Sequence, residues 1–281
     1  MSAEFDAWVG RSECADDCID ARFARRMAAT LDAAVAGPAD LSDAQVLPPL
    51  WHWMGWAPET GMSELDQDGH PKRGGFLPPV PLERRMWAGG RVTFHAPLRI
   101  GEVLRRRSEI LRVADKSGAS GRMVFVTVRH EIVAASGLAL TEEQDIVYVA
   151  MPETYTPPPP VPAPTVASWE EAVQIDTVRL FRFSALTFNA HRIHYDLDYT
   201  RKVEKYPGLV VHGPLQAILL MEAARRHRGG AMPRSYRYRG IRPLFHTDRL
   251  RLIGSAAQDG MQALCTATGE DVVCMQAEIG W

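Results

Sequence analysis

A proline-rich stretch divides this chain of 281 residues into two halves of similar length. Residues 151–166, MPETYTPPPPVPAPTV, hold seven prolines. Proline fixes the backbone φ angle and lacks an N–H group, so such a run forms a stiff, extended connection rather than part of a packed core. The sequence therefore predicts an N-terminal unit over residues 1–150, a linker over 151–166 and a C-terminal unit over 167–281.

The N-terminal half predicts a helix, then a long loop, then antiparallel strands. Apolar residues at four-residue steps over 17–36 indicate an amphipathic helix of about five turns. Residues 58–82 are rich in glycine, proline and charge, which is typical of a long surface loop, and such loops are often functional. Short Gly/Ser turns separate the expected strands, which lie at 91–95, 103–113, 123–134 and 144–149.

The C-terminal half repeats this order in outline. We expect a strand at 178–187 and a long apolar helix at 215–224. Further strands are expected at 236–246, 249–256, 261–267 and 272–279. A short similarity links the halves, because Gly90-x-x-x-Phe94-His95 is echoed by Gly240-x-x-x-x-Phe245-His246 at the same point of each half. The matching order predicts two copies of one fold.

Composition excludes several classes of partner. A formal net charge of −2 gives no basic field for nucleic acid or for an anionic membrane. No run approaches 18 uninterrupted apolar residues, and the acidic N-terminal stretch does not resemble a secretory signal. Cys14 and Cys18 have CxxxC spacing, but no second pair of ligands lies near them in the sequence to complete a zinc site. We therefore expect a cytoplasmic protein with ordinary thiols on or beside its first helix.

Residues 183–224 concentrate the chemistry of the chain in two polar clusters. Asn189 and His194 stand where the expected strand gives way to a turn, and His212 and Gly213 precede the long helix. A neutral imidazole exchanges protons near pH 7, so His194 is the candidate general acid and base. The amide of Asn189 is suited to holding a water. The backbone N–H of Gly213, followed by Pro214, would stabilise negative charge at a helix N-terminus.

Other interpretations of these clusters stay open. A histidine beside apolar residues is often purely structural, although three histidines within 22 positions favour a function. His191 and His194 have the spacing of a metal-binding pair, but no carboxylate pattern in the sequence completes it, so we expect no metal. The tryptophans at 51, 53 and 56 suit either a packed core or the wall of a ligand tunnel.

The two clusters resemble the motifs of the MaoC-like, (R)-specific enoyl-CoA hydratase family of hot-dog folds. Asn189-Ala190-His191-Arg192-Ile193-His194-Tyr195-Asp196 matches the first motif, and Val210-Val211-His212-Gly213 matches the second. The resemblance implies that His194 is the catalytic histidine and that the Gly213 amide binds the thioester carbonyl. Asn189 falls where the family usually has a catalytic aspartate, which implies a single-histidine mechanism in which Asn189 positions water.

Further segments resemble the double hot-dog subgroup of that family. These are Pro49–Trp53, Arg84–Gly90 and Ser184–Asn189. The subgroup includes type 2 hydroxyacyl-thioester dehydratases and the mesaconyl-C4-CoA and itaconyl-CoA hydratases. The implied fold is α+β, with two antiparallel sheets that each wrap around a central helix, and the implied enzyme is a hydro-lyase that adds water reversibly to a 2-enoyl-CoA thioester.

The resemblance also implies how substrate is held. It implies no cofactor beyond the coenzyme A of the substrate, and a homodimer or higher homo-oligomer. A dicarboxylic acyl group would need a cation, for which Arg192 is closest by sequence and Arg84, Arg85 and Arg242 are further candidates. The residues expected to contact substrate are His191, Arg192, Tyr195, His212, Arg85 and Trp53. The alternatives are a fatty-acid-type dehydratase, with the tryptophans lining its tunnel, and a non-catalytic acyl-CoA binding module.

Overall fold

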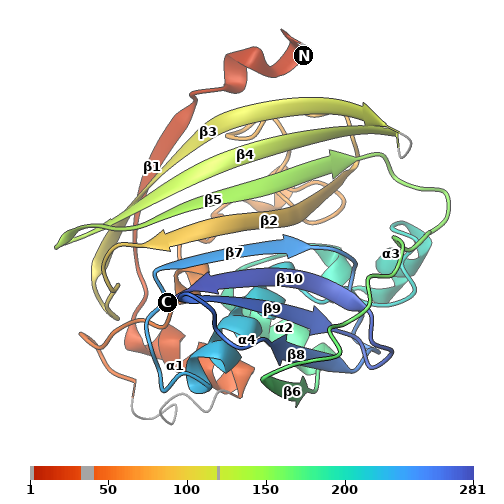
Figure 1. The fold of residues 1–281 in the computed structure, drawn as a ribbon. Coiled ribbons are helices and arrows are strands. Elements are labelled where there is room, and N and C mark those ends of the chain that lie inside the picture. The colour runs from red at the N-terminus through yellow and green to blue at the C-terminus, as the bar shows by residue number, and fades with distance from the viewer. Residues whose placement is uncertain (1–2, 33–40, 119–120) are drawn as a thin grey trace.

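The computed structural model describes residues 3–32, 41–118 and 121–281, and these form one ten-stranded antiparallel sheet (Figure 1). The strand order is β1-β3-β4-β5-β2-β7-β10-β9-β8-β6. The first half supplies β1 (Ser12–Cys18), β2 (Arg84–Phe94), β3 (Val103–Gly118), β4 (Gly121–Ala134) and β5 (Gly137–Val149). The second half supplies β6 (Trp169–Val173), β7 (Ser235–Gly240), β8 (Leu250–Gly254), β9 (Met261–Ala267) and β10 (Val273–Gly280).

The strands of the two halves meet at the pair β2–β7, whose register places Gly90 opposite Tyr238. β2 also pairs with β5 and β7 with β10, so each half continues the sheet away from this seam. The stretch from 151 to 168 crosses from one half to the other (Figure 1). It meets the sheet through the bridge between Pro162 and Val272 and through backbone hydrogen bonds that join Val161 to Val273 and Ser168 to Gly254. The domain bounds expected from the proline run stay a prediction.

The second half curves around a buried central helix, α4 (Gly213–Arg226). Residues 215–224 are all buried, Gln216 and Glu222 included, which explains why the sequence there is mostly apolar rather than amphipathic. The other helices are α1 (Ala21–Leu31), α2 (Thr177–Leu186) and the short α3 (Leu197–Lys202). Single 3₁₀ turns lie at Ala3–Trp8, Trp51–Met54, Met62–Glu64 and Arg192–His194.

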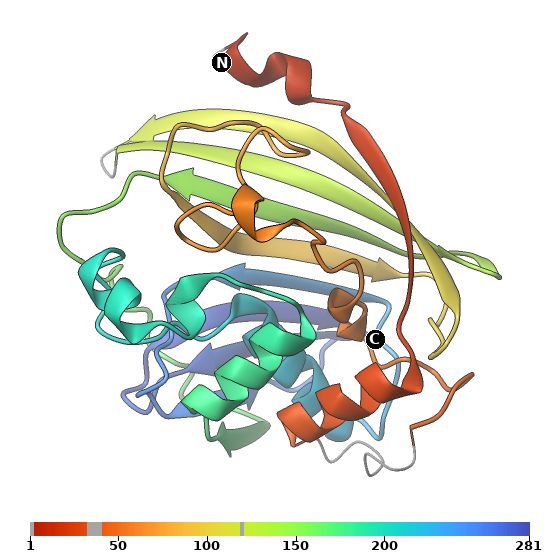
Figure 2. The ribbon, with the colours of Figure 1, turned by 180° about the vertical axis from the view of Figure 1, so that it is seen from behind.

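The first half is filled differently, because the loop over 41–82 covers the inner face of its sheet (Figure 2). Trp51 and Val80 from this loop are buried. α1 instead lies at the end of the molecule where it contacts α2 (Figure 2). The first half therefore surrounds a loop where the second half surrounds a helix, and space for a ligand is left between them.

Three expectations about local structure were wrong. The helix predicted over 17–36 is the eleven-residue α1, because Ser12–Cys18 pairs with β3 as an edge strand and Asp20 caps the helix after it. Cys14 and Cys18 therefore lie on a strand, and residues 33–36 of that prediction lie outside the described residues. The strand predicted over 178–187 is α2, which buries Leu180, Phe183 and Leu186 at helical spacing.

The seam between the halves predicts a sharp difference between two glycines. A Cβ added at Gly89 would lie 2.5 Å from the backbone oxygen of Tyr238, whereas one at Gly240 would lie no closer than 3.5 Å to its neighbours. Because backbone cannot move as a side chain does, Gly89→Ala should destabilise the fold by about 1–3 kcal/mol. Urea unfolding of both variants checks this, with Gly240→Ala as the matched control. Equal stabilities would contradict the close approach at β2–β7.

Candidate active site

His194 lies at the end of the 3₁₀ turn that follows α2, with its ring held in a single orientation. Its Nδ1 lies 2.7 Å from the backbone oxygen of Val210. A carbonyl oxygen only accepts hydrogen bonds, so the proton of the neutral ring is on Nδ1 and the lone pair is on Nε2. Burial, together with His212 and His191, holds the pKa of His194 well below its ordinary value. The Nε2 atom is therefore the acceptor of a neutral base.

His212 supports His194 from behind. The two rings stack with centroids 3.6 Å apart and planes 20° from parallel. His212 Nε2 lies 2.9 Å from the hydroxyl of Ser184, and burial lowers the pKa of His212 to about 3. His212 is not among the residues that line the cavity described below. His212 thus lies behind His194 rather than in the cavity wall, and the direct substrate contact expected from the sequence stays a prediction.

Gly213 opens α4 with an N–H group that has no partner within the helix. A Cβ at this position would lie 2.7 Å from the ring of Trp87, so glycine is the residue that fits. Trp53 packs edge-on against Trp87, at a centroid distance of 5.3 Å and an angle of 87°. The helix N-terminus is thus fixed between an aromatic pair from the first half and the turn that holds His194.

Asn189 uses its side-chain oxygen locally. The oxygen accepts the N–H of His191 at 2.9 Å, while the N–H of Asn189 itself donates to the backbone oxygen of Ser184 at 2.8 Å. This turn orients the segment that leads to His194. What Asn189 offers to a ligand is its amide nitrogen, which is a donor.

One cavity of about 1150 Å³ brings together residues from both halves. Of the sequence-predicted site residues, it is lined by His194, Asn189, Gly213, His191, Arg85 and Trp53. Trp53 and Trp56 contribute to its wall, while Trp51 is buried in the core, so both interpretations of the tryptophan cluster apply to different members.

Arg192 and Tyr195, which the sequence also suggested as substrate contacts, lie outside this lining. Arg192 pairs with Asp196 at 2.7 Å and stacks over the ring of Tyr199. The Tyr195 hydroxyl donates to the backbone oxygen of Ala190 at 3.0 Å, and 47% of the residue is exposed. Arg192, the cation closest to His194 in the sequence, is thus already paired with Asp196, which caps α3.

Three arginines that line the cavity, Arg85, Arg106 and Arg242, form no ion pair with a carboxylate in the part of the chain that the structure describes. Of these, Arg85 lies two positions before Trp87 on β2, on the face that looks toward Gly213. Arg84, which alternates to the other face, pairs with Glu204 at 2.7 Å. Within residues 3–32, 41–118 and 121–281, Arg85 forms no ion pair with a carboxylate at 4.0 Å or less. Arg85 is therefore a cation that is available to a bound anion.

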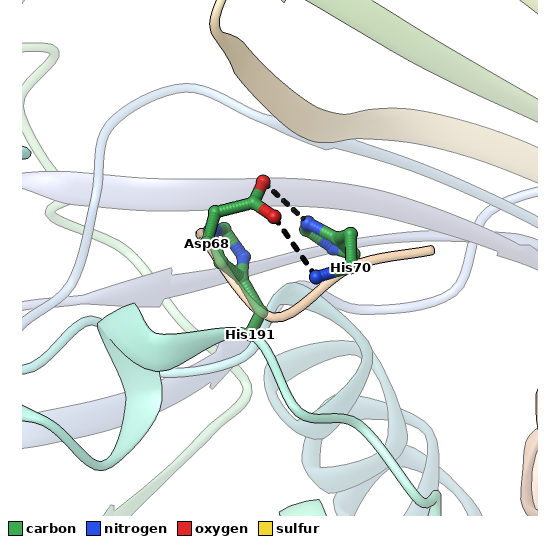
Figure 3. A group of neighbouring side chains, drawn as sticks. All are labelled: Asp68, His70 and His191. Carbon is green, nitrogen blue, oxygen red and sulfur yellow. Dashed lines mark hydrogen bonds and ion pairs between the residues drawn. The ribbon is translucent and has the colours of Figure 1, made fainter. Parts of the chain in front are cut away.

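The sequence did not identify two residues that lie beside the cluster, Asp68 and His70 (Figure 3). They belong to the loop over 58–82, and His70 lines the cavity. Ligand-type atoms of Asp68, His70 and His191 all lie within 4.8 Å of one another. The run Asp66-Gln67-Asp68-Gly69-His70 was a signal of polar character, but nothing in the sequence indicated that it lies against His191.

Comparison with known proteins places this geometry in a family. The family model for hydroxyacyl-thioester dehydratase type 2 matches residues 50–246. Over 277 residues the chain is 46% identical to the mesaconyl-C(4)-CoA hydratase of Chloroflexus aurantiacus, covering 96% of this chain and 95% of that protein. The chain belongs to the hydroxyacyl-thioester dehydratase type 2 family. The expected enzyme class, a hydro-lyase, is confirmed at this level.

One more distant relative and two solved structures are also similar to this family member. The mitochondrial hydroxyacyl-thioester dehydratase type 2 of Schizosaccharomyces pombe is 25% identical, over 73% of this chain and 77% of that protein. A MaoC-like dehydratase structure superposes with a TM-score of 0.74 at 15% identity, with 98% of both chains covered. A Mycobacterium tuberculosis protein described as a double hot-dog gives 0.62 at 14% identity, with 99% and 98% covered. The expected α+β double hot-dog fold is confirmed. Two details of the expectation differ, because the two sheets are joined into one at β2–β7 and only the second half wraps around a helix.

The buried histidines of this family member predict a loss of stability in acid. The folded-state pKa is lowered to about 3 for His212 and to about 4 for His130, in both cases by burial first. Below an ordinary histidine pKa near 6.5 the unfolded chain takes up protons that the folded chain refuses, so stability falls as pH falls. The cost at pH 5 is about 2 kcal/mol for each such histidine.

His212→Gln tests this contribution while keeping a side chain that can bond Ser184. The free energy of unfolding, measured in urea at pH 7 and at pH 5, should fall by about 1–2 kcal/mol less in the variant than in the wild type. An unchanged difference between the two pH values would show that His212 is already protonated in the folded protein.

Proposed function

We propose that this protein adds water reversibly to a 2-enoyl-CoA thioester with a dicarboxylic acyl group, such as mesaconyl-C4-CoA or itaconyl-CoA. The observation that carries the proposal is the single cavity that holds a neutral imidazole acceptor, a free helix N-terminal amide and an arginine without a carboxylate partner. The mesaconyl-C(4)-CoA hydratase relative supports the acyl group.

Hydration needs two roles, which we propose for two different residues: polarisation of the thioester carbonyl by Gly213 and proton transfer by His194. The Gly213 N–H binds the thioester oxygen and draws electron density from the β-carbon. The Nε2 atom of His194 takes one proton from water as the oxygen bonds to the β-carbon, and the electron pair of the double bond moves to the thioester oxygen as an enolate. His194 then returns the proton to the α-carbon, the carbonyl reforms, and the product is the 3-hydroxyacyl thioester. Asn189 orients the water with its amide nitrogen.

Arg85 is proposed to bind the free carboxylate of the acyl group. A guanidinium matches a carboxylate with two parallel hydrogen bonds, and such pairs are strong where water is excluded. The position of Arg85 two residues before Trp87, whose ring lies against position 213, supports a carboxylate site near the Gly213 amide. His191 and Trp53 complete the proposed contacts, as wall residues of the same cavity.

Proton transfer and carbonyl polarisation account for the reaction, so we propose no cofactor beyond the coenzyme A of the substrate. We also propose a homodimer or higher homo-oligomer and a cytoplasmic location. Among the described residues, no helix is both long enough and apolar enough to cross a membrane. A fatty-acid-type dehydratase is the second candidate function, favoured by the aromatic wall formed by Trp53, Trp56 and Trp87.

The assignment of His194 is tested by its removal. His194→Ala should lower kcat for hydration by about two or more orders of magnitude, because general base catalysis is lost. Loss of the enoyl-thioester absorbance follows the reaction directly. His95→Ala is the matched control, since His95 is exposed, bonds Thr141 of β5 and does not line the cavity. A folded His194→Ala protein with near-wild-type turnover, or a wild type that binds enoyl-CoA without hydrating it, would contradict the proposal.

The role of Arg85 is tested by substrate preference. Arg85→Met should lower kcat/KM for itaconyl-CoA or mesaconyl-C4-CoA by about tenfold or more, because a desolvated ion pair is lost, and should leave crotonyl-CoA nearly unchanged. Arg192→Met should leave kcat/KM unchanged for both kinds of substrate, because the Arg192 side chain is held by Asp196. A greater effect of Arg106→Met, which removes another arginine of the cavity wall, would place the carboxylate elsewhere.

A further inference from the structure

The loop that carries Asp68 and His70 is fixed to the catalytic segment rather than lying loosely over it. The N–H of Arg192 donates to the backbone oxygen of Asp68 at 2.9 Å, and the Arg192 guanidinium donates to the oxygen of Gln67 at 3.1 Å. Gly69 has a φ of +91°, and a Cβ there would lie 1.9 Å from the oxygen of Ala190. This close approach needs glycine and brings the first half of the chain into direct contact with the residues just before His194.

Asp68 and His70 form a hydrogen-bonded dyad (Figure 3). One carboxylate oxygen of Asp68 accepts the backbone N–H of His70 at 2.9 Å, and the other lies 2.8 Å from His70 Nδ1. Burial and the nearby charge of Arg85 lower the pKa of His70 to about 3, although Asp68 opposes this shift. The ring is therefore neutral with its proton on Nδ1, and Nε2 is left as an acceptor.

The dyad lies within the same constellation as His194. The rings of His70 and His191 have centroids 4.1 Å apart, and the ring of His191 meets that of His194 edge-on at 5.4 Å. All three rings line the cavity, and 22% of the His70 side chain is accessible. Two imidazoles in this cavity thus present, on the evidence of their hydrogen-bonded Nδ1 atoms, a free Nε2 acceptor.

An attacking water has two hydrogens to place. His194 Nε2 accepts one of them. The side-chain oxygen of Asn189 already receives the N–H of His191, which leaves it one lone pair, and its nitrogen is a donor. A second acceptor would fix the orientation of the water, so that its remaining lone pair points at the β-carbon.

We propose that His70 Nε2 is this second acceptor for the water that His194 deprotonates, and that Asp68 is the positioning residue that holds His70 in the required tautomer. The inference deepens the proposed function and rests on it. Water would then be held by hydrogen bonds to His194 and His70 and from the amide of Asn189. Two of these groups come from the second half of the chain, and the third is delivered by the loop of the first half.

The hydrogen bonding favours this role over a metal site. Asp68, His70 and His191 have the ligand types of a two-histidine, one-carboxylate centre. However, Asp68 directs both oxygens to His70, and His70 Nδ1 is occupied by that contact. These contacts leave Asp68 and His70 Nδ1 already bonded to each other. The experiment below includes a metal-removal step that distinguishes the dyad from a metal site.

Three variants of the purified full-length protein test the dyad: Asp68→Asn, His70→Leu and the double variant. Asp68→Asn keeps the shape but offers an N–H to Nδ1, which moves the ring proton to Nε2 and converts the acceptor into a donor. Each single variant should lower kcat for mesaconyl-C4-CoA or itaconyl-CoA hydration by about two orders of magnitude, with KM changed by less than about threefold. The double variant should be no slower than His70→Leu, because Asp68 acts through His70.

Asp66→Asn is the matched control, since Asp66 lies in the same loop but pairs with Arg73. It should keep activity within about twofold, and all variants should unfold within a few degrees of the wild type. If the wild type is active and depends on His194, but His70→Leu is within about threefold of it, this inference alone fails. Single-variant losses that multiply in the double variant would also overturn it. Activity that is lost on dialysis against EDTA and restored by Zn²⁺ would replace the dyad by a metal site.

Discussion

The contact between Trp87 and Gly213 is the constraint on which the site depends. The indole ring occupies the space where any other residue at 213 would carry a Cβ, so the strand β2 of the first half touches the first residue of the helix α4 of the second. Tyr238 stacks on the other side of Trp87 at 4.4 Å and ties this contact to the β2–β7 seam. A change that separates the halves would therefore also release the amide proposed to bind the thioester oxygen.

Electrostatics in the cavity favour neutral imidazoles. His194 is buried beside His212, and neither has a carboxylate hydrogen bond, so protonating either ring would place a charge in an apolar setting. The ring nitrogens bond instead to the Val210 carbonyl and the Ser184 hydroxyl, which fix orientation without adding charge. Such a site returns a proton readily after accepting it, which suits a reaction in which water and the α-carbon exchange one proton.

The sequence alone predicted those parts of the site whose residues lie close together along the chain. The turn at Asn189, the free nitrogen of His194 and the helix start at Gly213 arise from residues close in sequence, so their clustering was visible before the structure. The strand expected at 178–187 is a helix because Leu180, Phe183 and Leu186, three residues apart, form its buried face, and Asp176 caps its start. The strand at 12–18 was missed because its side chains are mostly exposed, and edge pairing with β3 leaves no apolar pattern.

Residues brought in by tertiary contact were beyond such reasoning. Arg192 was favoured by sequence distance, but a neighbouring carboxylate four residues away neutralises it, whereas Arg85 reaches the cavity from β2. Asp68 and His70 reach it because Gly69 allows the backbone to approach Ala190 more closely than any side chain would permit. In this fold the second half builds the proposed base and the proposed carbonyl-binding amide from residues close in sequence, and the first half adds a loop and a strand that complete the surroundings of the same atoms. The chemistry of position 189 should therefore be interpreted together with the loop that packs beside it, because that loop adds the imidazole of His70 as a further acceptor in the same cavity.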